Sequence, residues 1–492
     1  MTYAIMSISA IIPKLQNFLT PSSRNSRKSN HGFTIKPPTV RTLPSLAAVL
    51  SDPYVLQIAE TLEDSLTLPT TTPPLQKLRD TSSQSLLSSR WPSRKDEPFR
   101  FTDFSFLKNY QIQPVTSPED LSFSEFTVFT DAPLPNLAIV DGHLVDSLLR
   151  LDNLTDGVLV GRLSSSIFSE EILKKVCEHA STFDGDLFWS LNGVGAPDMV
   201  VVYVPEGCKV ESPLHLTYLS VVGSEKGEKS LPISNPRVLV VVEKGGEISL
   251  VEEYVGADGA KSYWANPVME IVIGEGAKVD HSYIQIQSHN AAHIKWTWIR
   301  QELGSTYKLV EVSSGGKLSR HNLHVEQVGS ETVTELSAFH LVIGDQTQDL
   351  HSRLVLNHPR GVSKQLHKCI VAHSSGQAVF DGNVQVNRYA QQTDAGQLTR
   401  SLLLEPRATI NVKPNLQIIA DDVKCSHGAA ISDLEESQLF YFQARGIDTE
   451  TARKALIFSF AAEVVERISD NSTKKKVEAH IRELLNPMPS SN

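Results

Sequence analysis

The sequence has no apolar segment long enough to cross a membrane. Among its 492 residues the longest apolar runs, such as Met199–Val204 and Val238–Val242, fall far short of the roughly 20 residues that a membrane helix needs. Cysteine is also scarce, with four residues and no CxxC pair, which argues against a zinc ribbon and a disulfide scaffold. A net charge of −10 argues against a nucleic-acid-binding protein, which usually carries a basic domain. The composition, 40% hydrophobic and 21% charged, is that of an ordinary globular protein.

Acidic residues are absent from the first 51 positions, which hold six Lys or Arg residues and many Ser and Thr. The rest of the chain contains the other 40 basic residues and all 56 acidic residues, so its net charge is −16. An acid-free, basic leader rich in hydroxyl groups is typical of an organellar transit peptide, and an unstructured tail is the alternative. The uncharged first 13 residues and the serine content favour the chloroplast over the mitochondrion. We therefore expect residues 1–50 to be a plastid transit peptide.

Motifs for nucleotide binding and ester hydrolysis are missing. The nearest approach to a phosphate-binding loop, Gly223–Ser230, is one residue too short between its glycines and is followed by Pro232 rather than by a helix. Neither GxGxxG nor GxSxG occurs. The chain itself is therefore expected to be neither an ATPase nor a serine hydrolase.

The chain after the leader divides into three regions. Residues 51–197 are mixed but mostly helical, with helical periodicity at Val55–Leu66, Leu75–Leu87 and Ser169–Ala180. Residues 198–430 consist of short β-branched runs separated by Gly or Pro. Turn glycines there recur 15–17 residues apart, at Gly329, Gly344, Gly361 and Gly376. This loose repeat favours a parallel β-helix, and a double-sheet sandwich is the alternative.

Residues 431–492 return to helical periodicity. We expect helices at Asp433–Arg445, at Thr449–Ile468 and from about Ser472 onward. The apolar face of Thr449–Ile468 is wider than one core contact requires, which favours a partner surface. The alternative is that these helices cap the open end of the β-helix.

Cys425 and His427 are the strongest candidates for metal ligands. They are two residues apart, so in an extended segment they point to the same face. A thiolate beside an imidazole suits iron, zinc or part of an iron–sulfur site, but two ligands are too few for a closed site. Asp421 and Asp422 can add oxygen ligands or simply end a strand. Spacing alone favours a buried cysteine beside a hydrogen-bonded histidine.

Histidine is enriched before this pair. A face lined by histidines can bind metal, but histidines more commonly occupy surface positions or stack on neighbouring turns. Seven histidines fall within 53 residues: His321, His324, His340, His351, His358, His367 and His373.

Several long stretches of the C-terminal 290 residues resemble the SufB/SufD family of iron–sulfur cluster assembly proteins. They are Gln391–Leu404 (QQTDAGQLTRSLLL), Lys413–Ala430 (KPNLQIIADDVKCSHGAA), Leu439–Ile447 (LFYFQARGI) and Phe460–Val464 (FAAEV), with weaker similarity at Val204–Leu216. The form ADDVKCSHGA resembles SufD. SufB proteins carry a scaffold cysteine slightly upstream, and Ser401–Arg407 has none here.

The resemblance implies an all-β core, a right-handed parallel β-helix, flanked by an N-terminal mixed domain and a C-terminal helical domain. It implies a heterodimer with a SufB-like scaffold through the β-helix and docking of a SufC-like ABC ATPase on the C-terminal helices. The docking residues expected on this basis are Phe440, Tyr441, Arg445, Gly446, Phe458 and Phe460. No membrane or nucleic acid partner is expected.

The family's functional histidine corresponds to His427, with Cys425 beside it. Both are expected to share an interfacial iron or nascent iron–sulfur site with SufB, and no cofactor is expected to bind stably to this chain alone. The expected role is thus a non-catalytic subunit in the chloroplast stroma that assists iron entry and cluster assembly.

Two other classes of protein remain as alternatives. A SufB-like scaffold would hold a cluster by itself, which the missing upstream cysteine argues against. A carbohydrate-active β-helix enzyme would need paired carboxylates in a groove. Adjacent acids such as Asp421 and Asp422 occur, but no convincing catalytic groove is apparent from the sequence.

Overall fold

The computed structural model describes residues 52–66, 72–118, 120–122, 124–126, 135–179 and 183–485. The expected transit peptide, residues 1–50, lies outside these ranges. Within the described ranges, no helix has both the length and the apolar character needed to span a membrane.

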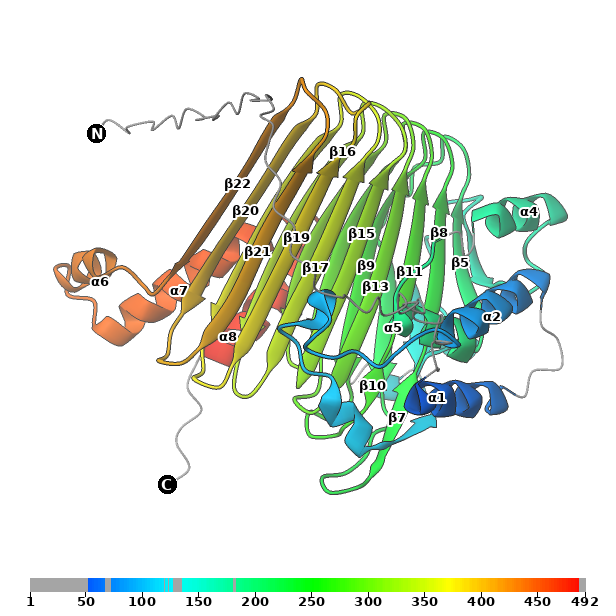
Figure 1. Cartoon of the computed structure of the whole chain (residues 1–492), viewed down its shortest axis with the longest axis horizontal. Helices are drawn as coiled ribbons and strands as arrows, with labels where there is room; N and C mark the ends of the chain where they lie inside the picture. The colour runs from blue at the N-terminus through cyan, green and yellow to red at the C-terminus, as the bar shows by residue number, and fades with distance from the viewer. Residues whose placement is uncertain are drawn as a thin grey trace, which may run out of the picture. The chain divides into compact units, whose positions relative to one another are not determined.

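The centre of the described chain is a parallel β-helix of about seven turns, which runs from green to orange in Figure 1. Consecutive strands alternate between two sheets, so neighbours within a sheet are one turn of the chain apart and run parallel. The expected β-helix is confirmed. The sandwich alternative is wrong, because the sheets of such a sandwich are built from antiparallel strands.

The two sheets are called sheet A and sheet B. Sheet A contains, in spatial order, β21 (Thr409–Ile418), β19 (Gln377–Val386), β17 (Thr347–Leu356), β15 (Leu318–Gln327), β13 (Ala292–Gln301), β11 (Val268–Ile273), β8 (Arg237–Val242), β5 (Met199–Val204) and β4 (Leu159–Arg162). The strands attached beside it are β1 (Gln111–Pro114), β7 (Ser230–Ser234) and β10 (Trp264–Ala265).

Sheet B contains β22 (Lys424–Ser432), β20 (Asp394–Leu403), β18 (Val362–Val371), β16 (Val333–Val342), β14 (Thr306–Ser314), β12 (Lys278–Ile286), β9 (Glu247–Gly256), β6 (Leu214–Ser220), β2 (Asn136–Val140) and β3 (His143–Leu144). Strands that precede residue 198 therefore also belong to both sheets.

The turns that lead from sheet A to sheet B are built alike. One residue per turn adopts a left-handed backbone with φ between 60° and 68°, and its N–H donates to a carbonyl of the next turn, as Gly276 does to Leu303 at 2.8 Å. Glycine suits this conformation because it has no Cβ atom. Together these left-handed residues form a column, one from each turn, with glycine in the earlier turns and other residues later. Its members are Gly207, Gly245, Gly276, Gly304, Glu331, Arg360 and Gln392.

The N-terminal helices lie against the early turns. They are α1 (Pro53–Asp64), α2 (Pro73–Leu86), α4 (Glu170–His179) and α5 (Leu187–Gly195), with short 3₁₀ segments at Glu97–Phe99, Ser105–Asn109 and Asp146–Leu148. Helix α5 was not predicted, because its sequence LFWSLNGVG is apolar all round and contains two glycines. It packs on sheet A beside a fully buried ion pair, Arg237 to Glu270 at 2.6 Å, and Asn192 of α5 accepts a bond from the same guanidinium.

The C-terminal helices are α6 (Glu436–Gln443), α7 (Thr449–Val465) and α8 (Asn471–Leu485). Helix α7 packs across β14, β16 and β18 on the outer face of sheet B, where Ile457, Ala461 and Val464 are buried. Most of the wide apolar face that the sequence indicates is therefore used within the chain. The alternative in which the helices cap the β-helix is wrong, because all of β22 except Cys425 and Gly428 is exposed.

Candidate functional site

The last turn of the β-helix, formed by β21 and β22, is an open end (Figure 1). Ile419 N, just after β21, donates to Val386 O at 2.9 Å, so the odd-numbered residues of β21 bond to β19. Successive residues of a parallel strand bond to opposite sides, so the even-numbered residues turn their backbone groups to the free edge. Pro414 stands at an even position, where a missing N–H costs no bond to β19.

In β22 the pattern is shifted by one residue. Lys424 N donates to Thr393 O at 2.8 Å, so the even-numbered residues bond to β20. The odd-numbered residues that face the free edge are Cys425, His427, Ala429 and Ile431. An edge with free N–H and C=O groups is a template for pairing with another chain.

The side chains of Cys425 and His427 lie on the same face of β22, as the sequence predicts. Their register partners on β20 are Ala395 and Gln397. Ala395 belongs to the core inside the β-helix, and Cys425 packs against that core. The pair therefore occupies inward-facing positions on a turn that has no following turn to cover it.

Apolar side chains at the open end are uncovered in the same way. Val386 of β19 is fully buried, but its register partner Ile418 is 46% exposed. Ile431 of β22 is 49% exposed, although its register partner Ser401 is buried. The last turn thus presents a cross-section of the core to its surroundings.

The two candidate ligands differ in exposure. Cys425 is half-buried, and burial raises the pKa of its thiol above the usual value. His427 is exposed. It also borders a groove of about 510 Å³ on the outer face of sheet B, beside Glu463 of α7 and Arg467.

Cys425 and His427 do not form a complete metal site on their own. In the described part of the chain, no three His, Cys, Asp or Glu side chains are placed to hold one metal ion. Asp421 and Asp422 lie in the turn before β22, where Asp422 O accepts a bond from Gln392 N. A closed site needs about four ligands, so further ligands would have to come from outside the described chain.

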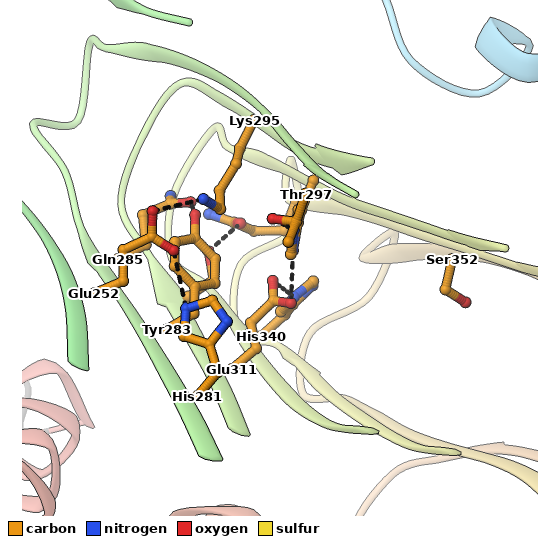
Figure 2. A network of polar contacts seen from close by, with 12 residues as sticks. Glu252, His281, Tyr283, Gln285, Lys295, Thr297, Glu311, His340 and Ser352 are labelled. Carbon is orange, nitrogen blue, oxygen red and sulfur yellow. Dashed lines mark hydrogen bonds and ion pairs between the residues drawn. The ribbon is translucent and has the colours of Figure 1, made fainter. Parts of the chain in front are cut away.

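The middle turns contain a buried polar network that the sequence did not predict (Figure 2). Glu252 of β9 is fully buried, and its carboxylate lies 2.6 Å from Lys295 Nζ and 3.1 Å from His281 Nε2. Burial works to raise the pKa of Glu252, but the charges of Lys295 and His281 outweigh burial and hold it below the usual value. Tyr254 completes the cluster by donating its hydroxyl to Glu252 at 2.6 Å.

A second carboxylate, Glu311 of β14, lies between two histidines in the same interior (Figure 2). It is 2.8 Å from His321 Nδ1 and 3.0 Å from His340 Nε2. Burial acts against ionisation, but the two histidines lower the pKa of Glu311 below the usual value. His367, which stacks on Phe380, has a pKa well below normal because it is buried and lies near His340.

The seven clustered histidines thus have separate environments. His321, His340 and His367 are inside the β-helix, and His324 is buried on the outer face of sheet A. His351 pairs with Asp349 at 3.0 Å, whereas His358 and His373 are exposed at turns. The described histidines do not gather into a metal-binding group.

The residues expected to dock a partner fall into two sets. On α6, Phe440 is 69% and Tyr441 56% exposed, and Arg445 lies 3.4 Å from the centroid of the Tyr441 ring. Gly446 follows the helix with φ of 79°. On α7 the rings contact cations of the same chain: Arg482 lies 3.6 Å from the Phe458 centroid, and Lys368 lies 3.9 Å from that of Phe460.

Two families match the chain. Residues 223–460 match the family described as SUF system FeS cluster assembly, SufBD core domain, and residues 51–216 match the SufBD protein N-terminal region. Both candidate ligands and the inward-facing network lie within the first match.

Three relatives show how far the similarity extends. The chain is 55% identical to Protein ABCI7, chloroplastic, from Arabidopsis thaliana, over 98% of this chain and 100% of that protein. It is 37% identical to an iron–sulfur cluster assembly SufBD family protein from Synechocystis, over 79% and 86% of the two chains. It is 27% identical to the iron–sulfur cluster assembly protein SufD of Escherichia coli, over 82% and 91%.

Proposed function

The chain belongs to the SufB/SufD family of iron–sulfur cluster assembly proteins, and on this premise we propose that it is the SufD-type subunit of a plastid SufBCD complex. It is a SufD-like plastid protein. In the proposal it works in the stroma, pairs with a SufB-like scaffold, binds a SufC-like ATPase and assists iron entry and cluster assembly. The partner SufC hydrolyses the ATP, and this chain makes or breaks no bonds itself.

The open last turn is the observation that supports this proposal most strongly. It combines free backbone groups along β22 with exposed inward-facing side chains, Ile418 and Ile431. A partner that adds a further turn would satisfy the backbone groups and bury the apolar ones. A SufB-like protein, built on the same family fold, is the partner proposed to do so.

Cys425 and His427 would then lie at the boundary between the two subunits. Iron or a nascent cluster is the cargo of the complex, and a soft thiolate and an imidazole are suitable ligands for it. The remaining ligands would come from the scaffold subunit, in agreement with the incomplete ligand set of the described chain. Because the thiol has a raised pKa, binding would require the loss of its proton.

The ATPase is proposed to dock on α6, where Phe440 and Tyr441 are the most exposed apolar residues. Helix α7 connects this surface to the outer face of sheet B through its buried residues. Movement of the ATPase subunits would be transmitted along this path and open the subunit boundary for iron.

The first test is reconstitution with the SufB-type and SufC-type proteins of the plastid. We expect the wild-type chain to form the complex, and we expect His427→Ala to form it equally well with a lower yield of clusters. An unchanged cluster yield would remove His427 from the site. Failure of the wild-type chain to associate with a SufB-type protein would remove the proposed function itself.

The second test addresses ATPase docking. Deletion of residues 433–492 would also strip the buried face of α7 from sheet B, so a surface change is more informative. Phe440→Asp with Tyr441→Asp is expected to weaken SufC binding at least tenfold. Ile167→Asp, at a 47% exposed apolar position elsewhere, is the matched control and is expected to bind normally. Equal affinity of all three proteins would disprove docking on α6.

A further inference from the structure

The imidazole of His427 has no hydrogen-bond or ion-pair partner among the described residues. A histidine that binds a metal through one nitrogen is usually held by a hydrogen bond from the other nitrogen, which fixes the tautomer and the ring orientation. An acceptor within this chain would fix the ring of His427 in the same way.

Gln397 of β20 is the candidate for this acceptor. It is the register partner of His427 on the preceding strand and is only 3% exposed. Its amide nitrogen donates to Gln365 Oε1 at 2.8 Å, and Gln365 Nε2 donates to Ser352 Oγ at 2.7 Å. In this arrangement the amide nitrogen of Gln397 is occupied by Gln365.

The side-chain carbonyl oxygen of Gln397 takes no part in these hydrogen bonds. It is buried and has no hydrogen-bond partner in the structure. Buried carbonyl oxygens usually have a partner. The side-chain oxygens of Asn266, Gln327 and Asn383 also lack one, but the oxygen of Gln397 belongs to the register partner of a candidate ligand. Gln397 and His427 are register partners on β20 and β22, and both occupy inward-facing positions at the open end.

The opposite sheet is shaped around the Gln397 amide. Gly382 of β19 faces it, and a Cβ atom added to Gly382 would lie within 2.3 Å of Gln397 Nε2. The φ of Gly382 is outside the left-handed region, so its backbone does not require glycine. The missing side chain at this position therefore leaves room for the Gln397 amide and for the ring of Phe380, which a Cβ atom would approach to 2.7 Å.

We propose that Gln397 is the positioning residue for His427: its free carbonyl oxygen accepts the N–H of the imidazole and turns the other ring nitrogen toward the iron. This inference rests on the proposed function, because it presumes that His427 binds the cargo ion. In this proposal the orientation of the His427 ring is set by a residue of β20, in the turn before the last one. Gln365 and Ser352 hold Gln397 in place, and Gly382 provides the space.

The test uses the reconstituted complex with the SufB-type and SufC-type subunits, and Fe²⁺ alone as the probe under anaerobic conditions. Fe²⁺ affinity is measured by calorimetry, and ligation by histidine nitrogen is measured by pulsed electron paramagnetic resonance on a nitrosyl adduct of the bound iron. We expect Gln397→Leu to weaken Fe²⁺ binding about 10- to 100-fold. We expect Gln397→Glu, which keeps an acceptor oxygen, to restore affinity to within a few-fold of wild type.

Two further variants separate positioning from a structural role. Gly382→Ala is expected to displace the amide and reproduce the loss seen with Gln397→Leu. Gln365→Leu, one turn deeper, removes a polar contact but leaves the Gln397 oxygen in the chain, and is expected to have a smaller effect. In a His427→Ala background, Gln397→Leu is expected to cause no further loss of affinity.

The outcomes are distinguishable. Normal Fe²⁺ affinity and an unchanged nitrogen signal in Gln397→Leu, when His427→Ala weakens binding, would overturn the positioning role and leave the proposed function intact. Equal losses for Gln397→Leu and Gln365→Leu without rescue by Gln397→Glu would also overturn it. If His427→Ala itself binds Fe²⁺ normally, the proposed site and the positioning role both fail.

Discussion

Inward-facing polar side chains have opposite environments in two parts of the β-helix. These parts are the middle turns, β9 to β16, and the last turn, β21 and β22. In the middle turns Glu252 and Glu311 are fully buried, and each carboxylate has at least two partners in the same chain. In the last turn Cys425 and His427 occupy inward-facing positions too, but they are partly or largely exposed. The fold and the face are the same, and only the next turn is missing.

This comparison shows that a polar residue inside a β-helix is not by itself a functional site. Each turn is completed by the next one, so the polar groups of the middle turns are satisfied within the chain. The last turn has no successor, and its polar groups and backbone edge remain available to a partner. The middle network is thus expected to govern stability, and the last turn is expected to govern assembly.

The largest effect is expected from breaking the network in the middle turns. Lys295→Met leaves the carboxylate of Glu252 without its closest cation, and we expect a destabilisation of about 3–5 kcal/mol. The double variant Lys295→Met with Glu252→Leu is expected to recover much of this loss, because neither charge is then buried alone. Denaturation midpoints of both variants and the wild type measure the effect. A loss below about 1 kcal/mol for the single variant would show that the network is not essential to stability.

The next effect is expected at the edge of the last turn. Ala429→Pro removes an N–H that faces the free edge and bonds to nothing in β20, so the chain alone is expected to keep its stability. Its affinity for the SufB-type partner is expected to fall about 100-fold, which corresponds to about 2.7 kcal/mol. Calorimetric titration with the partner measures this. Normal affinity would mean that β22 does not pair across the boundary.

A pH effect is expected from the middle turns. Burial, together with the charge of Lys295, lowers the pKa of His293 to about 3, compared with about 6.5 in an unfolded chain. At His293 the folded chain therefore binds fewer protons than the unfolded chain. The contribution of His293 to the free energy of unfolding is complete above pH 6.5 and is lost as the pH falls, by up to about 1.4 kcal/mol per pH unit. His293→Gln is expected to flatten the acid side of the stability profile. The control is His358→Gln at an exposed turn, and identical profiles for both variants would contradict this origin.

The smallest effects are expected in the column of left-handed turn residues. Gly276 in the middle turns has open space where a Cβ would lie, so Gly276→Ala tests the backbone alone and is expected to cost about 1 kcal/mol. Gln392, beside the last turn, has φ of 60°, and Gln392→Gly is expected to be neutral or slightly stabilising. Thermal midpoints measure both changes. If Gly276→Ala stabilised the protein, the left-handed backbone at this position would not disfavour a side chain.

The parts of the structure that depend on local periodicity could be predicted from the sequence. Strand β5 has the expected bounds Met199–Val204, and helix α7 begins at the expected Thr449. The shared face of Cys425 and His427 follows from the two-residue period of a strand. The regular spacing of the turn glycines matches the alternation of strands between the two sheets.

The parts that depend on register could not be predicted. Glu252 pairs with Lys295 across 43 positions, and Gln397 lies beside His427 only because β20 and β22 are neighbours in sheet B. The available signal was a charged residue within an apolar strand, as at Glu311 between Val310 and Val312. This signal marks a buried partner but does not identify it, because partner identity depends on which strands stack.

Hydrogen exchange of the β22 amides tests the central claim most directly. The amides of Cys425, His427, Ala429 and Ile431 face the free edge, so they are expected to exchange fast in the isolated chain and slowly when the SufB-type partner is bound. The alternate amides, which bond to β20, should be protected in both states. Equal exchange at the four edge amides with and without the partner would contradict the claim that the last turn is completed by another subunit.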